Sequence, residues 1–236
     1  MARKPGARGG LRRLLMRLVI LLIVIPPLWV AIYRFVPPPI TILMIERLAE
    51  GHGLTRVWTP ISDISPTMVR AVIASEDSRF CSHHGFDFRA IDAALKHDQS
   101  GRGRLRGGST ISQQTAKNVF LWPERSWVRK GAEAAFTVLI EGIWGKRRIM
   151  EVYLNTIEMG PGLYGVGAAS EHYFGVPAKA LSPADAGRLA AILPDPLKWK
   201  AARPGPYVRR RTDSIEARSG TVARDGLARC VLGDNA

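Results

Sequence analysis

The pattern of apolar and polar positions changes most sharply near the start of the chain. Residues 14–36, "LLMRLVILLIVIPPLWVAIYRFV", are almost wholly apolar, and no charge falls between Arg17 and Arg34. As a helix rising about 1.5 Å per residue, this run covers roughly 34 Å, enough for the hydrocarbon core of a bilayer. The flanking arginines can extend to the two interfaces. The pattern predicts one transmembrane helix, kinked at Pro26 and Pro27 as membrane helices tolerate.

The distribution of charge predicts the orientation of this helix in the membrane. The formal net charge is +14, and half of that excess precedes Glu46, where no acidic residue occurs. The basic leader, residues 1–13, predicts a cytoplasmic N-terminus and an extracytoplasmic chain after Pro39. A cleaved signal peptide is the alternative, but no small-x-small cleavage site follows the apolar run. We therefore expect an uncleaved anchor. Nucleic-acid binding, which the basic charge alone would allow, is not expected of a domain outside the membrane.

Helical periodicity begins after a short linker, which we place at residues 37–54. Ser65 is a good N-cap and Pro66 suits the first helical position. Apolar residues then recur from Val69 at i, i+3 and i+4, and Glu76 follows at i+7. A carboxyl on a core-facing stripe loses solvation, which raises its pKa and suits it to proton transfer. The alternative is that Glu76 is a polar residue at the rim of the core.

A basic, glycine-containing loop precedes the next helix. Residues 102–118, "RGRLRGGSTISQQTAKN", contain the capping-box pair Thr110 and Gln113. Free N–H groups at this helix start, with glycines that allow close approach, suit an anion such as phosphate. The stretch lacks the P-loop pattern, and an ordinary surface loop is the alternative. The side chains that could join an anion-binding cradle are Arg106, Gln113, Gln114 and Lys117.

Residues 126–155 predict two helices that meet near Gly145, and the first carries a second candidate carboxylate. Glu133 follows Arg129 by four positions and Lys130 by three, so we expect two cations beside it on the helix surface. Opposite charge favours the ionised carboxylate. One carboxyl that exchanges a proton and one that stays anionic form the usual division of labour in glycosyl transfer. Viewed alone, Glu133 could equally be a surface ion pair.

The cysteines and the C-terminal segment carry less information. Cys81 and Cys230 are the two cysteines of the sequence. They could pair if both are extracytoplasmic, but two cysteines make no disulfide framework, so we expect two unpaired thiols. We place the folded domain at residues 55–200. Residues 201–236 are rich in arginine and glycine and lose apolar periodicity, which predicts a peripheral helix or a partly disordered tail.

Four motifs in order carry a resemblance to a known family. They are "EDSRFCSHHG" (E-D-x-x-F-x-x-H-x-G), "GGSTISQQTAKN" (G-G-S-T-I-[ST]-Q-Q-x-x-K-N), "RKGAE" (R-K-x-x-E) and "KRRIMEVYLN" (K-x-x-I-[LM]-E-x-Y-L-N). Over roughly residues 57–199 the chain resembles the peptidoglycan glycosyltransferases, a family shared with the N-terminal domain of bifunctional penicillin-binding proteins. No S-x-x-K motif follows, so it is most similar to the monofunctional biosynthetic transglycosylases.

The resemblance implies a fold and a reaction. The fold is all-α and lysozyme-like, with a small membrane-facing jaw subdomain after the transmembrane helix. The reaction is polymerisation of lipid II: the growing glycan moves from its polyprenyl pyrophosphate to the 4-hydroxyl of the next lipid II, with inversion. The implied location is the bacterial inner membrane, with one membrane pass and the catalytic domain outside. The implied partners are lipid II, the lipid-linked glycan, the membrane and other cell-wall synthesis proteins.

The resemblance also implies roles for individual residues. Glu76 matches the general base, and Glu133 matches the second glutamate, which helps to manage the pyrophosphate, commonly with a divalent cation such as Mg²⁺ or Mn²⁺. The implied substrate-binding residues are Arg106, Gln114, Lys117 and Arg129, with Ser109, Asn118 and Lys146 as weaker candidates. The implied supporting residues are Asp77, Phe80, His83, Glu151 and Tyr153. Cys81 and His84 fall at variable positions, so no metal cluster is expected in their stretch.

The stretch "NVFLWPERSW", residues 118–127, falls where the family has its jaw and interleaves apolar and aromatic residues with charge. Tryptophan is frequent at membrane interfaces, so we expect membrane contact here, with core packing of Trp127 as the alternative. Two other functions remain open at this point. An anchored lysozyme-like hydrolase would not need the set Arg106, Lys117 and Arg129, and a non-catalytic scaffold for cell-wall synthesis would use the basic surface to bind partners.

Overall fold

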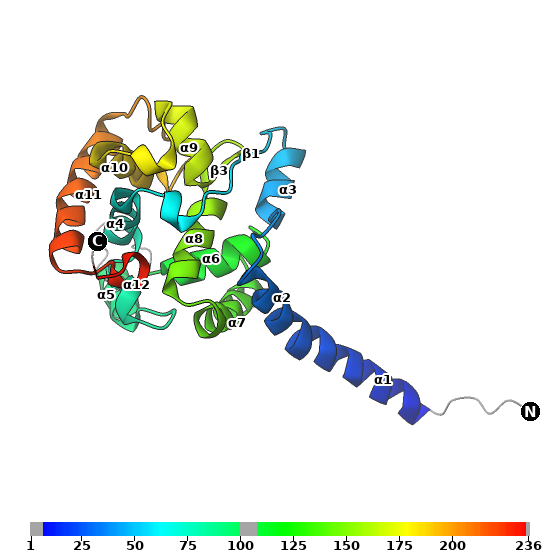
Figure 1. Cartoon of the computed structure of the whole chain (residues 1–236). Coiled ribbons are helices and arrows are strands. Elements are labelled where there is room, and N and C mark those ends of the chain that lie inside the picture. Colours follow the sequence, from blue (N-terminus) through cyan, green and yellow to red (C-terminus); the bar gives the residue numbers. More distant parts are fainter. Residues whose placement is uncertain (1–6, 100–107, 235–236) are drawn as a thin grey trace, which may run out of the picture.

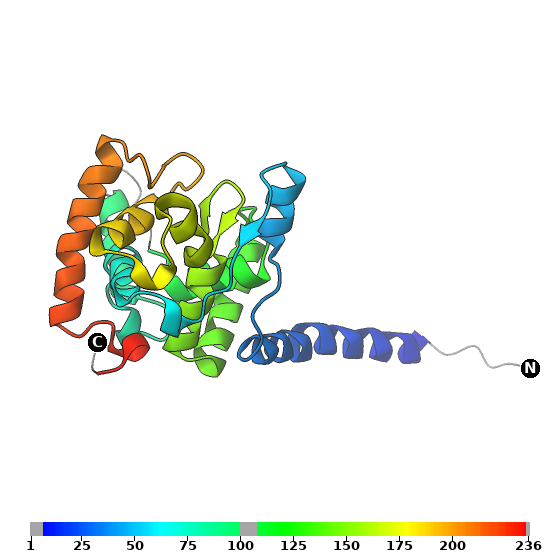
Figure 2. The ribbon, with the colours of Figure 1, turned by 45° about the horizontal axis from the view of Figure 1, so that its top comes forward.

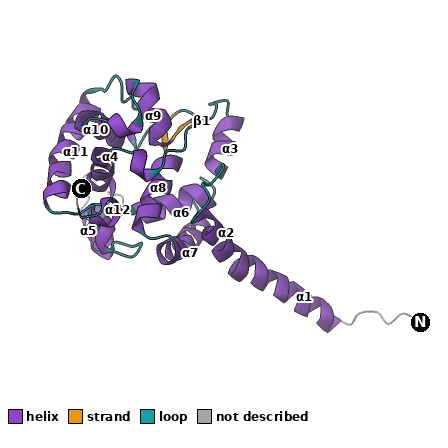
Figure 3. Cartoon of the chain, in the orientation of Figure 1, coloured by secondary structure: helices purple, strands orange, loops and turns teal. Residues whose placement is uncertain are grey.

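Helices dominate the described part of the chain, residues 7–99 and 108–234 of this computed structural model (Figure 3). The first are α1 (Ala7–Val19), α2 (Ile25–Tyr33) and α3 (Ile42–Ala49), with a π-helical turn at Ile20–Val24. The body contains α4 (Pro66–Glu76), α5 (Phe88–Gln99), α6 (Ile111–Phe120), α7 (Trp127–Ile143), α8 (Lys146–Thr156), α9 (Gly165–Phe174), α10 (Pro183–Ile192), α11 (Pro206–Arg224) and α12 (Arg229–Leu232). The strands are β1 (Thr55–Arg56), β2 (Glu158–Gly160) and β3 (Leu163–Tyr164). The predicted all-α class is confirmed.

The apolar run forms one extended helix that projects from the globular body (Figure 1). Arg12–Tyr33, with 22 residues and a mean hydropathy of 2.5, is long and apolar enough to cross a membrane. Pro26 and Pro27 remove N–H donors from the helix, and the π-helical turn just before α2 accommodates the interruption. The helix ends at Tyr33, short of the expected Val36, because three prolines follow and disfavour helical backbone before them.

The body-proximal end of this helix is docked on α7 and α8. Val30 is fully buried, and the Trp144 indole donates to its carbonyl oxygen at 2.7 Å. Arg148 donates to the carbonyl oxygen of Tyr33 at 2.8 Å. The ring of Trp29 contacts those of Tyr33, Phe120 and Phe136. The end of the apolar helix is therefore part of the domain's own core.

The segment 37–54, expected as a plain linker, contains the helix α3. Thr41 caps it by accepting from the Met44 backbone N–H at 3.3 Å, and Met44 is fully buried. Ile42, Ile45 and Leu48 of α3 are exposed. This part of the expected linker is helical because Thr41 caps the start of α3 and the Met44 side chain is buried in the domain.

The core of the body is built around α4 and α8. Met68, Val72 and Ile73 on α4 are fully buried, and α4 packs against α10 and α11. Leu154 on α8 is also fully buried, and α6 packs against both α7 and α8. The predicted N-cap Ser65 and the predicted capping box of Thr110 and Gln113 are both formed, so the starts of α4 and α6 are fixed by local hydrogen bonds.

A small sheet with strand order β1-β3-β2 closes one side of the body. β1 pairs with β3 in parallel, and β2 pairs with β3 in antiparallel fashion. The turn between β2 and β3 requires a glycine at position 162, because φ is +64° and a Cβ would lie 2.2 Å from the carbonyl oxygen of His52. The sheet thereby joins the chain after α3 to the chain after α8.

The C-terminal segment, expected to be a peripheral helix or partly disordered, forms the long helix α11. It packs along α4 and α10, and Figure 2 shows it running the height of the body. The residues that it buries are Val208, Thr212, Ile215 and Val222. The expected boundary at residue 200 is therefore wrong as a limit of the folded part.

Cys81 and Cys230 form a disulfide, with their Cα atoms 5.5 Å apart, so the expectation of two free thiols is wrong. Cys81 lies on the short 3₁₀ turn Phe80–Ser82, five positions after Glu76. Cys230 lies on α12, which returns the chain from the end of α11 to this turn. Their separation of 149 residues gave no sign of this proximity, because it arises from the path of α11 and not from any local pattern.

Candidate active site

Glu76 is the last residue of α4, and only 14% of its side chain is exposed. Its two oxygens have partners on different helices. The Gln114 amide on α6 donates to Oε2 at 3.2 Å, and a guanidinium N–H of Arg211 on α11 donates to Oε1 at 3.4 Å. Burial raises the pKa of Glu76 above its usual value, while the Gln114 hydrogen bond and the Arg211 charge oppose that rise. A poorly solvated carboxylate with a raised pKa is suited to accept a proton.

Asp77, the next residue, holds the end of α4 in place. Its carboxylate accepts from the backbone N–H of Ile111, the first residue of α6, at 3.0 Å. The same carboxylate lies 3.0 Å from Nε2 of His83. Phe80 is fully buried beside them, and its ring contacts that of His83. These contacts fix the position of Glu76 relative to the start of α6.

Tyr153 extends this network to α8. It is fully buried, and its hydroxyl donates to the Gln114 amide oxygen at 3.3 Å. Burial raises the pKa of Tyr153 well above its usual value, so the phenol remains a neutral donor. Because its amide oxygen is held by Tyr153, Gln114 directs its amide nitrogen toward Glu76. The candidate base is thus positioned by groups from α6, α8 and α11.

Glu133, the second candidate carboxylate, is buried on α7 with only 3% of its surface exposed. Arg129 donates to its Oε2 at 2.7 Å, and Lys130 binds its Oε1. The expected pair of cations is present, but Glu133 and Arg129 face the interior because this side of α7 packs on α6. Arg129 Nε is buried and has no hydrogen-bond partner among the described residues, so it can still donate to a bound anion.

Lys117 lies on α6, close enough to Glu133 and its neighbouring cations to be affected by their charges. Burial lowers the pKa of Lys117, and the nearby carboxylate of Glu133 opposes this shift. Arg129, Arg125 and Lys130 also act on Lys117 and favour loss of its proton. Four cations around one carboxylate leave an excess of positive charge, which an anionic ligand would neutralise.

A cleft of about 380 Å³ opens beside these groups. Its polar lining comes from α6, from the chain after α6, from α3 and from β2, and consists of Gln114, Lys117, Asn118, Arg125, Arg47 and Glu158. Leu43, Leu121 and Trp122 add apolar surface. The cleft therefore combines cations with apolar walls, as an anionic headgroup on an apolar chain would require.

A second, smaller cavity of about 200 Å³ is lined by Glu76 itself. Ser109, Thr110 and Arg218 also line it. Gln114 lines the first cleft and hydrogen-bonds Glu76, so this side chain lies between the two spaces. The candidate base thus opens on the smaller cavity and is connected to the larger cleft through Gln114.

The remaining predicted residues are divided between the site and its surroundings. Asn118 lines the larger cleft and Ser109 is exposed beside the smaller one, whereas Arg106 lies outside the described residues. Lys146, a weaker candidate for substrate binding, pairs with Glu141 at 2.6 Å and lies over the Phe80 ring. Glu151 pairs with Arg148 at 3.3 Å on its own helix.

Sequence reasoning missed the cations that come from distant elements. Arg211 and Arg218 on α11 face Glu76, and Arg47 on α3 contacts Glu158 at 3.5 Å at the rim of the larger cleft. The helical spacing of the residues that α11 buries could have predicted this helix, but the arginines between them make the pattern hard to recognise.

The residues around Glu133 do not make a metal site by themselves. No group of three or more His, Cys, Asp or Glu side chains is placed to hold a metal ion in the ranges 7–99 and 108–234. Both oxygens of Glu133 are already engaged by Arg129 and Lys130. Because Mg²⁺ is usually held by one or two carboxylates together with waters and substrate phosphates, a divalent cation here would take most of its ligands from outside the protein.

A partly buried glutamate and a buried one, in different charge environments on a helical body with a cation-lined cleft, are the arrangement expected of the glycosyl-transferring class. The family described as Transglycosylase matches residues 44–220, and the chain belongs to that family, with its lysozyme-like fold. The match extends beyond residues 57–199 at both ends and so includes most of α3 and α11.

Relatives support the same assignment. A biosynthetic peptidoglycan transglycosylase of Caulobacter vibrioides is 58% identical over 224 residues, which cover 95% of this chain and 97% of the relative. One from Rhodospirillum centenum is 54% identical and covers 93% and 96% of the two chains. One from Pseudomonas aeruginosa is 52% identical and covers 83% and 87%.

Proposed function

We propose that this protein polymerises lipid II into glycan strands. The observation that carries the proposal is that Glu76 lines one cavity and is hydrogen-bonded to Gln114, which lines a second cleft of cations and apolar side chains. A polymerase must place a lipid-linked donor and an acceptor hydroxyl on the two sides of one base. The names of the relatives, all biosynthetic, favour synthesis over hydrolysis or a purely structural role.

In the proposed reaction, Glu76 removes the proton from the acceptor 4-hydroxyl. The resulting oxygen nucleophile forms a bond to the anomeric carbon of the donor, and the bond from that carbon to the pyrophosphate oxygen breaks. Attack from the face opposite the leaving group inverts the configuration, so an α-linked donor yields a β-1,4 product. The proton remains on Glu76 until solvent removes it. General-base assistance of this kind contributes about 10²–10⁴-fold to the rate.

The enzyme must also stabilise the leaving group, because the pyrophosphate gains negative charge as its bond to the sugar breaks. Lys117 lines the cleft, and Arg129, whose charge acts on Lys117, has an unengaged Nε donor. Glu133 holds Arg129 and Lys130 in place by binding both. Preorganised charge stabilises a developing anion more effectively than mobile solvent does.

A divalent cation remains a proposal of its own. The described residues supply one engaged carboxylate, so any Mg²⁺ or Mn²⁺ would have to take most of its ligands from the pyrophosphate of the substrate. Electron paramagnetic resonance of Mn²⁺ tests this directly. We expect no tight binding by the protein alone and binding when a lipid-linked pyrophosphate is added.

The anchored arrangement supports an extracytoplasmic site of action at the bacterial inner membrane. The basic leader favours a cytoplasmic N-terminus, and the docking of Val30 and Trp29 into the body is a reason to retain the helix rather than cleave it. The disulfide between Cys81 and Cys230 suits an oxidising compartment outside the cytoplasm. The lipid-linked substrate would stay in the membrane beside the cleft. The basic surface would remain available to other cell-wall synthesis proteins.

Product analysis tests the proposed function. Purified full-length protein in lipid vesicles should convert labelled lipid II into long glycan chains and release polyprenyl pyrophosphate. It should release no fragments from isolated cell-wall sacculi. Fragment release without chain growth would assign a hydrolase, and the absence of both products would leave only a scaffold role.

A further inference from the structure

Arg211 occupies an unusual place for an arginine on the last long helix of the chain. Its side chain is 23% exposed and reaches Oε1 of Glu76 at 3.4 Å, across 135 positions of sequence. The next residue, Thr212, is buried, whereas the preceding Arg210 is exposed. Arg211 is therefore directed from α11 into the body, toward the candidate base.

We propose that Arg211 is a positioning residue for Glu76, holding Oε1 while Gln114 holds Oε2, so that the carboxylate keeps one orientation toward the acceptor hydroxyl. This inference rests on the proposed function. A carboxylate with one partner can rotate about its last bond, whereas partners on α6 and α11 restrict that rotation. Restricting a base to its reactive geometry increases the share of substrate encounters that lead to reaction.

The helix that carries Arg211 is held firmly enough for this role. Val208 and Ile215 anchor it in the core, and Gly187 on α10 allows close approach, since a Cβ there would lie 3.1 Å from the Thr212 side chain. Beyond its C-terminal end, α12 is joined by the Cys230 disulfide to the turn that follows Glu76. The helix with the arginine and the loop after the base are thus covalently connected.

The charges around Glu76 explain why a cation here also affects protonation. Asp77 on its own side raises the pKa of Glu76, in the same direction as burial. Gln114 from α6 and the arginines Arg211 and Arg218 from α11 lower it, while Tyr153 from α8 stays neutral. Loss of Arg211 therefore moves the pKa of Glu76 upward. Glu76 must be ionised to act as a base. On acidification, a variant without Arg211 would therefore lose activity at a higher pH than the wild type does.

The experiment compares initial rates of lipid II polymerisation from about pH 5 to pH 9 for the full-length wild type, Arg211→Gln, Arg211→Lys and Arg210→Gln. We expect Arg211→Gln to lower turnover about tenfold or more and to move the acidic limb of the profile up by about one pH unit. Arg211→Lys keeps the charge and should recover the position of that limb and part of the rate. Arg210→Gln removes an equal charge from the exposed face and should match the wild type.

Three results would overturn the inference while leaving the proposed function intact, because wild-type polymerisation is measured in the same assay. One is a wild-type rate and profile for Arg211→Gln. Another is a lower rate with an unmoved acidic limb, which assigns Arg211 a structural role only. If thermal melting shows that Arg211→Gln does not fold, Arg211→Lys decides, and a full wild-type rate with lysine at this position would contradict positioning by the guanidinium. Absence of polymerisation by the wild type would instead refute the proposed function.

Discussion

Glu76 and Glu133 differ in the charges that face each of them. Glu76 has one amide and one guanidinium as partners, and burial raises its pKa. Glu133 is ion-paired through both oxygens with Arg129 and Lys130. The same side chain is thus prepared for proton exchange at one position and for holding cations at the other.

Replacing Glu133 by glutamine tests the second of these roles. We expect turnover of lipid II to fall about 10²–10³-fold, since Arg129 and Lys130 lose the charge that holds them beside the leaving group. The free energy of unfolding should fall by about 1–3 kcal/mol, because two cations remain with a weaker partner. Steady-state kinetics and urea unfolding measure the two effects. Turnover within about twofold of the wild type would contradict the assigned role.

Replacing Lys117 by alanine tests the cation-lined cleft. We expect the dissociation constant for an unreactive polyprenyl pyrophosphate in vesicles to rise about tenfold or more, since a charge-assisted contact is lost. Lys179→Ala is the matched control, because Lys179 is 70% exposed and pairs only with Asp63 at its surface. Equal affinity of the Lys117 variant and the wild type would count against a pyrophosphate site in this cleft.

Residue-scale features were predictable where they depend on near neighbours. The cap at Ser65, the capping box of Thr110 and Gln113, and the cations next to Glu133 follow from spacings of two to four positions. The contact of Glu76 with Arg211 does not, because it joins residues 135 positions apart. The surface placement expected for Glu133 was wrong for a related reason, since helix spacing does not say which face of α7 packs on α6.

At the scale of elements, α4 and α6 were predictable because cap residues and apolar spacing agree in each. The helix α11 was harder to predict, although its buried residues Val208, Thr212, Ile215 and Val222 lie at helical spacing. Because arginines lie between these residues, the sequence pattern predicts a polar and exposed segment. A sparse apolar stripe is enough here because α11 lies against two other helices, α4 and α10.

The disulfide is an element-scale feature with a measurable effect. In a variant with both Cys81→Ser and Cys230→Ser, we expect the free energy of unfolding to fall by about 2–5 kcal/mol, because closing a loop of 149 residues restricts the unfolded chain. Urea unfolding of the purified variant measures the change. Wild-type protein kept under reducing conditions is the control and should match the variant. Equal unfolding midpoints for the oxidised wild type and the variant would contradict the assignment.

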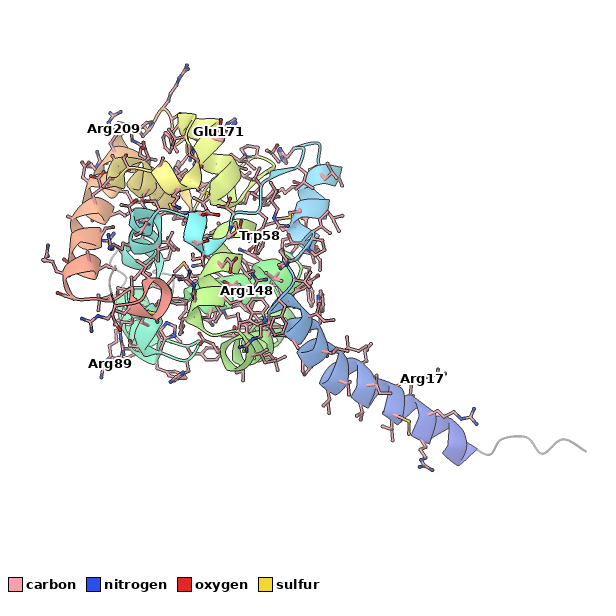
Figure 4. All side chains as sticks on the ribbon, in the orientation of Figure 1. Arg17, Trp58, Arg89, Arg148, Glu171 and Arg209 are labelled. Carbon is pink, nitrogen blue, oxygen red and sulfur yellow. A yellow bond between two sulfur atoms is a disulfide. The ribbon has the colours of Figure 1, made fainter. Side chains whose placement is uncertain are left out.

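At the scale of the whole molecule, the membrane helix and the body form one continuous structure. The helix projects from the body with Arg17 near its free end and Trp58 and Arg148 near the junction (Figure 4). Arg148 donates to the carbonyl of Tyr33 and lies 5.3 Å from the Trp58 ring centroid. Apolar length predicted the helix, but its docking could not be predicted because the partner residues lie more than 100 positions away.

This arrangement predicts the topology of the protein in the membrane. Protease added to the outer side of spheroplasts should digest the body and leave a short membrane-protected fragment that contains the basic leader. The expected result follows from the positive-inside rule and from the disulfide, which both favour an extracytoplasmic body. Complete protection of the body, with digestion only after lysis, would contradict the proposed orientation.

The central claim, that Glu76 is the general base of a lipid II polymerase, is tested most directly by one comparison. Full-length wild type, Glu76→Gln and Glu171→Gln are assayed for polymerisation of labelled lipid II in vesicles, with circular dichroism to verify folding. Glu171 on α9 is an exposed glutamate far in sequence from the site (Figure 4). We predict that Glu76→Gln folds but polymerises about 10²–10⁴-fold more slowly than the wild type, whereas Glu171→Gln keeps the wild-type rate. A folded Glu76→Gln protein that makes glycan at the wild-type rate would contradict the account.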